Sequence, residues 1–282
     1  MGLGLASWNI LLQLLLLCAY RSGARELREE SLPQMDVQLH HMHIAHHSSH
    51  VDVNSSEVKI FFTLRDLKVG NKMALYLPIE DHSNSAHFLP REEADSFPFS
   101  LKQLPYILEL TSIPRVSPQA KAMEDTLRMC ETDPIKDEIK TCATSLESML
   151  DFAGSIFGSE TGFKTVTTKS TSNTFQNYTI LEVQEIPASK MVACHYMSYP
   201  YAIYGCHSHM TENINKVFRV SLVGDNGDIA DAISACHLDT SQWNPDHLSF
   251  QILGIKPGTI PVCHYFPTDH LVFVPAAKDE FM

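Results

Sequence analysis

Regular alternation of hydrophobic and polar positions begins at Val58 and continues to Leu64. This period-two pattern predicts a strand with one buried face, and the turn at 68–71 predicts a return strand over 73–77. From Phe163 onward, short alternating runs recur between turns rich in Gly, Asn and Asp. These runs predict strands over 178–183, 191–197, 202–207, 216–223, 248–253 and 271–274.

Apolar residues at helical spacing occupy the middle of the chain instead. One stripe follows the cap-like pair Ser117-Pro118 and ends near Cys130, and a second runs from Ile139 through Cys142 to Ala153. A Cys130–Cys142 disulfide would staple the two predicted helices into a hairpin. Residues 81–118, rich in Pro, Ser, His and acidic groups, predict irregular surface structure. The elements together predict a β-rich α+β fold, stapled by disulfides, in a single domain over 57–277.

The N-terminal region has a different character from the rest. An apolar run over 10–19 precedes the small residues Ser22-Gly23-Ala24, which predicts a signal peptide over 1–24. A retained anchor is the alternative, because no Lys or Arg precedes the run. No later segment is long and apolar enough to be transmembrane.

Residues 25–56 predict a flexible, histidine-rich linker. It contains a tract of His40, His41, His43, His46, His47 and His50. Such a tract either binds metal loosely or is a solvated segment with no specific site. The last five residues, 278–282, are interpreted as a tail, and they do not form an ER-retention signal.

Charge and cysteine content restrict the functional classes. The net charge is −12 without any Lys/Arg-rich run, which argues against nucleic-acid binding. Entry into the secretory pathway predicts that the six cysteines left after loss of Cys18 form disulfides. These are Cys130, Cys142, Cys194, Cys206, Cys236 and Cys263. Sequons at Asn54 and Asn177 predict glycosylation in the same compartment.

Four of these cysteines are followed directly by histidine, at 194–195, 206–207, 236–237 and 263–264. Adjacent side chains on a strand point to opposite faces, so sulfurs would pair in one layer while imidazoles converge elsewhere. Histidine-only sites suit copper or zinc, and copper(II) stands higher in the affinity series. The predicted metal ligands are His195, His207, His237 and His264.

Further side chains near the pairs are candidates for the same centre. His209, His247 and His270 are secondary ligand candidates, and Asp246 and Asp269 each precede one of them as orienting carboxylates. Two alternatives remain open. The histidines either hydrogen-bond within a polar interior, or share a zinc site with thiolates, although structural zinc ligands are usually two to four residues apart.

Established catalytic signatures are missing from the sequence, including GxSxG, a Walker loop, HExxH and GxGxxG. The cysteines are poor candidates for nucleophiles because an oxidising compartment favours disulfides. Catalysis, if present, is therefore expected to depend on the histidines and a metal.

The spacing of the Cys-His pairs, with 10, 28 and 25 intervening residues, resembles the BURP-domain family of plants. Segments 61–68, 142–149 and 253–264 also resemble the opening, the central helix and the close of that domain. The resemblance covers about four fifths of the chain. Within the family, the short histidine-rich linker is similar to that of the short members first described from seeds and microspore-derived embryos.

The resemblance implies a secreted or vacuolar protein associated with seed development or stress, with cell-wall or vacuolar partners. Some members of the family are copper-dependent, autocatalytic cyclases that join a Tyr or Trp side chain to a core peptide. Carried over, His195, His207, His237 and His264 would hold the copper. Residues 25–74 contain no Tyr or Trp, so a peptide substrate would lie within the domain or arrive in trans. Metal buffering by the histidine tract is a third expected function.

Overall fold

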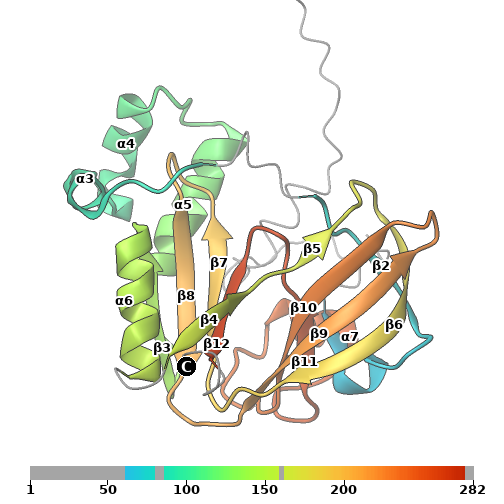
Figure 1. Cartoon of the computed structure of the whole chain (residues 1–282). Helices are drawn as coiled ribbons and strands as arrows, with labels where there is room; N and C mark the ends of the chain where they lie inside the picture. Colours follow the sequence, from blue (N-terminus) through green and yellow to red (C-terminus); the bar gives the residue numbers. More distant parts are fainter. Residues whose placement is uncertain (1–60, 80–85, 159–161, 277–282) are drawn as a thin grey trace, which may run out of the picture. The chain divides into compact units, whose positions relative to one another are not determined.

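The computed structural model describes residues 61–79, 86–158 and 162–276, and its strand ladders form two antiparallel sheets (Figure 1). The signal peptide, linker, Asn54 and tail predicted from the sequence lie outside these residues. The larger sheet has the order β1 (Phe61–Thr63), β11 (Val262–Tyr265), β10 (Ile229–His237), β9 (Asn215–Gly224), β6 (Gln176–Ile186) and β2 (Lys72–Leu75), with β5 (Lys169–Ser170) also on β10. The smaller sheet has the order β3 (Glu138–Ala143), β8 (Ile203–His209), β7 (Val192–Met197), β12 (Leu271–Pro275) and β4 (Phe163–Val166).

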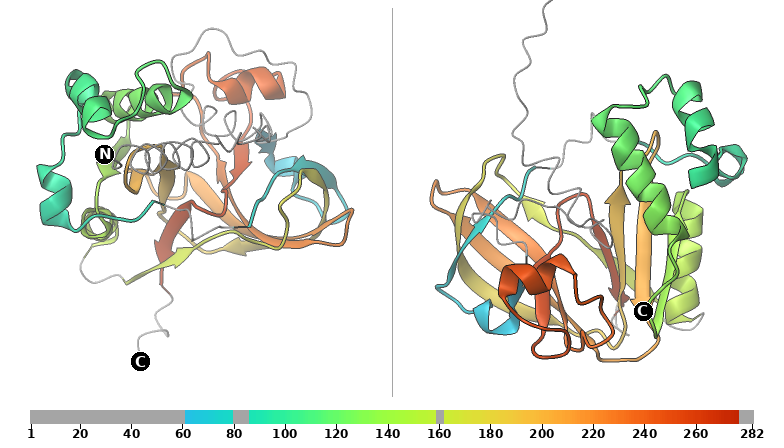
Figure 2. Two further views of the ribbon diagram at one scale, coloured as in Figure 1. Left: turned by 90° about the horizontal axis from the view of Figure 1, so that it is seen from above. Right: turned by 180° about the vertical axis from the view of Figure 1, so that it is seen from behind.

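The helices gather around the smaller sheet, apart from α7 (Leu248–Leu253), as Figures 1 and 2 show. They are α3 (Arg91–Ser96), α4 (Leu104–Leu110), α5 (Pro118–Glu131) and α6 (Leu146–Phe157), with the 3₁₀ turn Leu101–Gln103. The other 3₁₀ turn, Leu64–Asp66, directly follows β1 of the larger sheet. Met149 and Ala153 of α6 pack on the sheet face that carries Cys194 and Cys206. Within the described residues, no helix is long and apolar enough to cross a bilayer.

Packing between the sheets follows from strand alternation. Ala193 of β7 joins Ile233 and Ala235 of β10 in one core cluster, which Phe266 completes. Ala193 lies two positions before His195, and Ile233 and Ala235 lie four and two positions before His237, so each shares a strand face with that histidine. The two sheets therefore meet through the faces that carry the histidines, while the paired sulfurs lie in the outer layers with α6 or with Phe62 and Tyr265.

The structure confirms the β-rich α+β class and three disulfides, but the predicted helical hairpin is wrong. Residues 138–143 form β3, and α6 begins only at Leu146, where the Ser145 side chain accepts from the N–H of Ser148. Ile139, used as part of the helical stripe, is exposed. Pairing with β8 supplies the hydrogen bonds of this segment, so the Cys130–Cys142 disulfide joins α5 to a strand.

Residues 248–253 were predicted as a strand and form α7. The helix begins after His247, whose side chain accepts from the N–H of Ser249, and ends at Gly254 with φ 64°. A left-handed residue at this position is a common helix stop that glycine adopts without strain. The alternation of Leu248, Phe250 and Ile252 with two polar residues favours a strand, but a six-residue segment is too short for periodicity to exclude a short helix.

Two further predictions from the sequence are wrong. Residues 81–118 are not irregular throughout, because α3 and α4 bury Ala94, Ile107 and Leu108. The segments near 61 and 73 do not pair with each other: β1 pairs with β11, and β2 pairs with β6. Strand β10, which carries a Cys-His pair, was missed because both of its faces are largely buried and it therefore lacks clear alternation.

Candidate metal centre

The Cys-His pairs lie in two matching ladders. Cys194 is directly opposite Cys206 in the β7–β8 ladder, and Cys236 is directly opposite Cys263 in the β10–β11 ladder. Both cross-strand pairs are disulfides with Cα atoms 4.0 Å apart, and all four cysteines are buried. Because neighbouring residues alternate in direction, both histidines of each ladder emerge on the face opposite its disulfide. The predicted separation of sulfur and imidazole faces is thus present twice.

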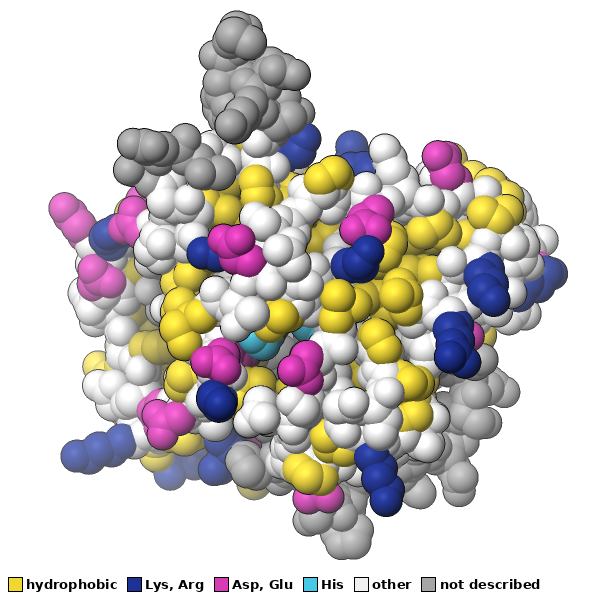
Figure 3. Space-filling view, turned by 90° about the horizontal axis from the view of Figure 1, so that it is seen from below, with side chains coloured by type: hydrophobic (Ala, Val, Ile, Leu, Met, Phe, Trp, Pro, Cys, Tyr) yellow, Lys and Arg dark blue, Asp and Glu magenta, His cyan; other side chains and the backbone are white. Residues whose placement is uncertain are grey.

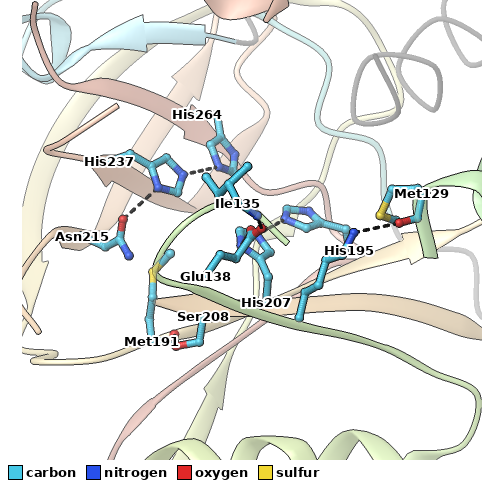
Figure 4. Close-up of polar contacts among 11 residues, drawn as sticks. Met129, Ile135, Glu138, Met191, His195, His207, Ser208, Asn215, His237 and His264 are labelled. Carbon is cyan, nitrogen blue, oxygen red and sulfur yellow. Dashed lines mark hydrogen bonds and ion pairs between the residues drawn. The ribbon is translucent and has the colours of Figure 1, made fainter. Parts of the chain in front are cut away.

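The ladders belong to different sheets, and their histidine faces meet. His195 and His207 come from the smaller sheet, while His237 and His264 come from the larger sheet (Figure 4). The rings of His195 and His264 have centroids 6.1 Å apart, and those of His209 and His237 are 6.4 Å apart. The sheet junction therefore gathers all four predicted ligands.

Within each ladder the two imidazoles face each other through one particular nitrogen. The Nε2 atoms of His195 and His207 are 3.2 Å apart, and those of His237 and His264 are 3.4 Å apart. The rings of each pair are stacked, with centroids 5.3 Å apart in the smaller sheet and 5.5 Å apart in the larger sheet. The same nitrogen of all four residues is thus directed toward a partner imidazole.

The opposite nitrogen, Nδ1, meets a different neighbour in each histidine. In the larger sheet, His237 Nδ1 lies 2.8 Å from Asn215 Oδ1, and His264 Nδ1 lies 3.3 Å from the Tyr265 carbonyl oxygen. Both oxygens can only accept, so each Nδ1 carries the proton. The two facing Nε2 atoms then present lone pairs to each other. Such a contact is repulsive unless a cation lies against both nitrogens, and this donor set fits copper or zinc.

In the smaller sheet the Nδ1 neighbours are Glu138 and His270. Glu138 Oε1 is 3.2 Å from His207 Nδ1, an ion-pair distance at which His207 Nδ1 nevertheless has no well-directed hydrogen bond. His270 Nδ1 is 3.0 Å from His195 Nδ1. A carboxylate behind a metal-binding imidazole is a recurring arrangement that fixes its tautomer and increases its basicity.

Burial determines the protonation of the larger-sheet pair. Desolvation lowers the pKa of His264 to about 4, and desolvation followed by the nearby His264 lowers the pKa of His237 well below its ordinary value. Both rings are therefore neutral at pH 7, as a metal ligand must be. At Glu138, burial would raise the pKa, but the contact with His207 and the N–H of Ile135 outweigh it and lower the pKa to about 2.

The four histidines line a cavity of about 520 Å³. Figure 3 shows histidine side chains at the bottom of a hollow, with acidic side chains close to its mouth. Phe61, Trp243 and Met129 contribute apolar surface, and the segment 131–135 between α5 and β3 forms part of the wall. This volume is in the range of cavities that hold small molecules, and it also suits a short peptide segment.

The secondary candidates lie near the centre in different ways. His209 is on β8 with its ring 6.5 Å from that of His207. His247 lines the cavity, but its Nδ1 contacts Ser249 Oγ at 2.7 Å, and its ring packs against Trp243. His270 contacts His195 through the nitrogen that faces away from His207. Asp246 lies in the exposed turn before His247, whereas Asp269 Oδ1 is 3.6 Å from His270 Nε2.

Over the described ranges, no three His, Cys, Asp or Glu side chains are already arranged to hold one ion. The imidazoles lie in pairs, so a third ligand would come from ring rotation, from a bound molecule or from water. Sequence reasoning missed Glu138, Asn215 and Trp243. Asn215 is directly opposite His237 in the β9–β10 ladder, and Glu138 is directly opposite His209 in the β3–β8 ladder. Only the strand register reveals these neighbours.

Comparison with known proteins gives the family. The model of the BURP domain matches residues 60–275, a range that includes all four Cys-His pairs and both ladders. This chain belongs to the BURP-domain family. The BURP domain-containing protein BNM2A of Brassica napus is 42% identical over 224 residues, which cover 76% of this chain and 79% of the relative.

Two Arabidopsis thaliana proteins show the same relationship. The BURP domain protein USPL1 is 38% identical over 242 residues, covering 82% of this chain and 85% of the relative. The BURP domain protein RD22 is 38% identical over 228 residues, covering 79% of this chain but 57% of the relative. The aligned segments of these three relatives cover 76%, 82% and 79% of this chain.

Proposed function

We propose that this BURP-domain protein binds copper through the paired Nε2 atoms of His195 and His207 and of His237 and His264. This proposal rests on the Nε2–Nε2 distances of 3.2 and 3.4 Å within the two pairs, while each Nδ1 lies against a different neighbouring group. In the larger-sheet pair, a shared cation would relieve the repulsion between the two facing Nε2 lone pairs. Copper(II) is favoured over zinc by its position in the affinity series.

The proposed setting is the secretory pathway, ending in the vacuole or the cell wall, with a role in seed development or stress response. Three disulfides support an oxidising compartment. The proposed glycosylation site Asn177 is exposed on β6, although its amide also lies 3.4 Å from Asp225 Oδ2. The similarity to USPL1, BNM2A and RD22 supports a common physiological class.

A second candidate function, copper-dependent peptide cyclisation, is favoured by the cavity. A metal with a purely structural role needs no open space beside its ligands, whereas these four histidines line about 520 Å³. Bound copper would supply one-electron chemistry with dioxygen. The chain itself would keep the ligand nitrogens unprotonated through the burial of His237 and His264, and Phe61 and Trp243 would provide apolar surface for a peptide segment.

Copper titration of the mature chain tests the first proposal. The variant His195→Ala/His207→Ala should lose the smaller-sheet binding, and His237→Ala/His264→Ala should lose the larger-sheet binding. An exposed histidine, His87→Ala, is the matched control. A variant with all six tract histidines changed to alanine measures the contribution of residues 40–50 separately. Unchanged copper binding in both double variants, with loss on removing the tract, would instead establish a buffering protein.

Peptide mass mapping before and after copper(II) and oxygen tests cyclisation. A crosslink removes two hydrogens from one Tyr- or Trp-containing peptide, and His237→Ala should abolish that change. The mapping is repeated with a candidate peptide added in trans. An unchanged map in both experiments, despite tight copper binding, would leave metal binding as the function and exclude cyclisation of those substrates.

A further inference from the structure

His270 is a buried histidine outside the two ladders. It lies in the chain between β11 and β12, is 3% exposed, and donates its backbone N–H to the Pro267 carbonyl. Its ring stands nearly perpendicular to that of His195, with centroids 5.0 Å apart. The Nδ1 atoms of the two rings are 3.0 Å apart, a hydrogen-bond distance. His270 therefore contacts the side of His195 that faces away from His207.

Two ring nitrogens at 3.0 Å can share only one proton between them. Asp269 Oδ1 lies 3.6 Å from His270 Nε2. This is longer than a hydrogen bond, but the negative charge still favours the proton on that nitrogen. His270 Nδ1 is then the acceptor, and His195 Nδ1 is the donor. His195 consequently presents an unprotonated Nε2 toward His207.

We infer that His270 is a positioning residue, which fixes His195 in its Nδ1–H form with Nε2 directed at His207. His270 Nδ1 accepts the hydrogen bond of His195 Nδ1–H, as Asn215 Oδ1 does for His237 and the Tyr265 carbonyl oxygen does for His264. The functional role of this positioning rests on the proposed metal binding, but the tautomer of His195 can be measured in the metal-free protein. His270 itself lies behind His195 and, unlike the four paired histidines, is not among the residues that line the cavity.

The test is nitrogen-15 NMR of histidine tautomers in the metal-free, full-length mature protein, with His195 assigned by substitution. Wild type should show His195 protonated at Nδ1. His270→Leu removes the acceptor and should shift His195 toward the Nε2–H form. His270→Gln retains an acceptor oxygen and should restore the Nδ1–H form. Thr268→Val, which removes a buried hydroxyl from the same turn, is the control and should leave the tautomer unchanged.

Copper(II) titration is the second measurement. His270→Leu should weaken binding at the smaller-sheet pair by about 10- to 100-fold, with substantial recovery in His270→Gln. An Nε2–H tautomer of His195 in wild type, or an unchanged tautomer in His270→Leu, would overturn the inference. The expected tautomers without any copper binding would support the positioning role and refute the proposed function. If His270→Leu does not fold, the wild-type tautomer and His270→Gln still decide the question.

Discussion

The two Cys-His ladders are built alike and surrounded differently. In each, a disulfide joins two directly opposed strand residues, and two imidazoles emerge on the other face. The larger-sheet imidazoles, His237 and His264, are buried and rest on neutral oxygens. The smaller-sheet imidazoles, His195 and His207, are less buried and adjoin an ionised carboxyl, Glu138, and a second histidine.

The comparison shows that the Cys-His motif determines how the imidazoles are placed, whereas the neighbouring side chains determine their charge and protonation. Strand alternation alone is enough to pair the imidazoles, because a Cys opposite a Cys places both following histidines on one face. The charge and protonation of each pair then depend on side chains contributed by other strands. The larger-sheet pair is a neutral, buried donor set, whereas the smaller-sheet pair has a carboxylate beside it whose negative charge favours a cation.

Removing a ladder disulfide should have the largest effect on stability. Cys236→Ala/Cys263→Ala opens a link across 27 residues, and Cys194→Ala/Cys206→Ala opens one across 12. Loop-closure entropy predicts losses of about 3.5 and about 3 kcal/mol respectively in the free energy of unfolding. Urea denaturation of both double variants measures them. A larger loss for the shorter link would show that packing around the sulfurs outweighs chain entropy.

Acidification should affect the larger-sheet pair next. His264 has an ordinary pKa of 6.5 and about 4 when folded, so the unfolded chain takes up the proton first as pH falls. Stability of the metal-free protein is thus fully present above pH 6.5 and decreases toward pH 4, by about 3 kcal/mol for this residue. His237 acts in the same direction.

Glu138, beside the smaller-sheet pair, titrates at lower pH than His264, so the pH dependence of stability can distinguish the two ladders. Its pKa falls from 4.5 to about 2 on folding, so its contribution is present above pH 4.5 and is lost as pH falls toward 2. Urea midpoints across pH 2 to 7 measure both windows. His264→Gln should reduce the loss of stability in the upper window, to which His237 still contributes, and Glu138→Gln should flatten the lower window. A flat profile between pH 6.5 and 4 in wild type would contradict the burial argument.

Removing the Nδ1 neighbours should weaken copper binding by a smaller amount. Glu138→Ala and Asn215→Ala should each reduce affinity about 10- to 100-fold at their own ladder. The effect of Glu138→Ala should decrease at high salt, because it removes a charge, whereas that of Asn215→Ala should not. Competition with a copper chelator measures both, and the exposed Glu182→Ala serves as control. Equal salt dependence would remove the proposed distinction between the ladders.

The smallest expected effect comes from making one ladder resemble the other. Gly205 is directly opposite His195, at the position that Ala235 occupies opposite His264. A Cβ at Gly205 would lie 2.7 Å from Met129 Cε, the mobile end of a side chain that lines the cavity. Gly205→Ala should therefore cost about 1 kcal/mol of unfolding free energy as Met129 moves aside. A loss above about 3 kcal/mol would mean that the backbone, rather than Met129, must shift.

The separation of sulfurs from imidazoles could be predicted from the sequence because strand alternation is local, whereas the Cys194–Cys206 and Cys236–Cys263 pairings were left open. Alternation along 191–197 already separates Cys194 from His195, and the Cys130–Cys142 pair follows from its proximity along the chain. The pairing of strands that are far apart in the sequence could not be predicted from local patterns. Nothing near His207 in the sequence indicates Glu138, because residues 144–202, which include α6, separate β3 from β8. Likewise, the helical spacing of apolar residues through Cys142 does not produce a helix there, because pairing with β8 holds residues 138–143 as a strand.

The adjacency of cysteine and histidine also bears on the order in which the protein matures. In a nascent, reduced chain, four thiols would sit beside four imidazoles, and thiolates would compete with them for copper. Oxidation would remove that competition and, in the same event, fix the register that places both imidazoles of a ladder on one face. If the proposed metal binding holds, the chain would become selective for histidine coordination only after its thiols are oxidised. In the proposed order of maturation, disulfide formation would precede loading with metal.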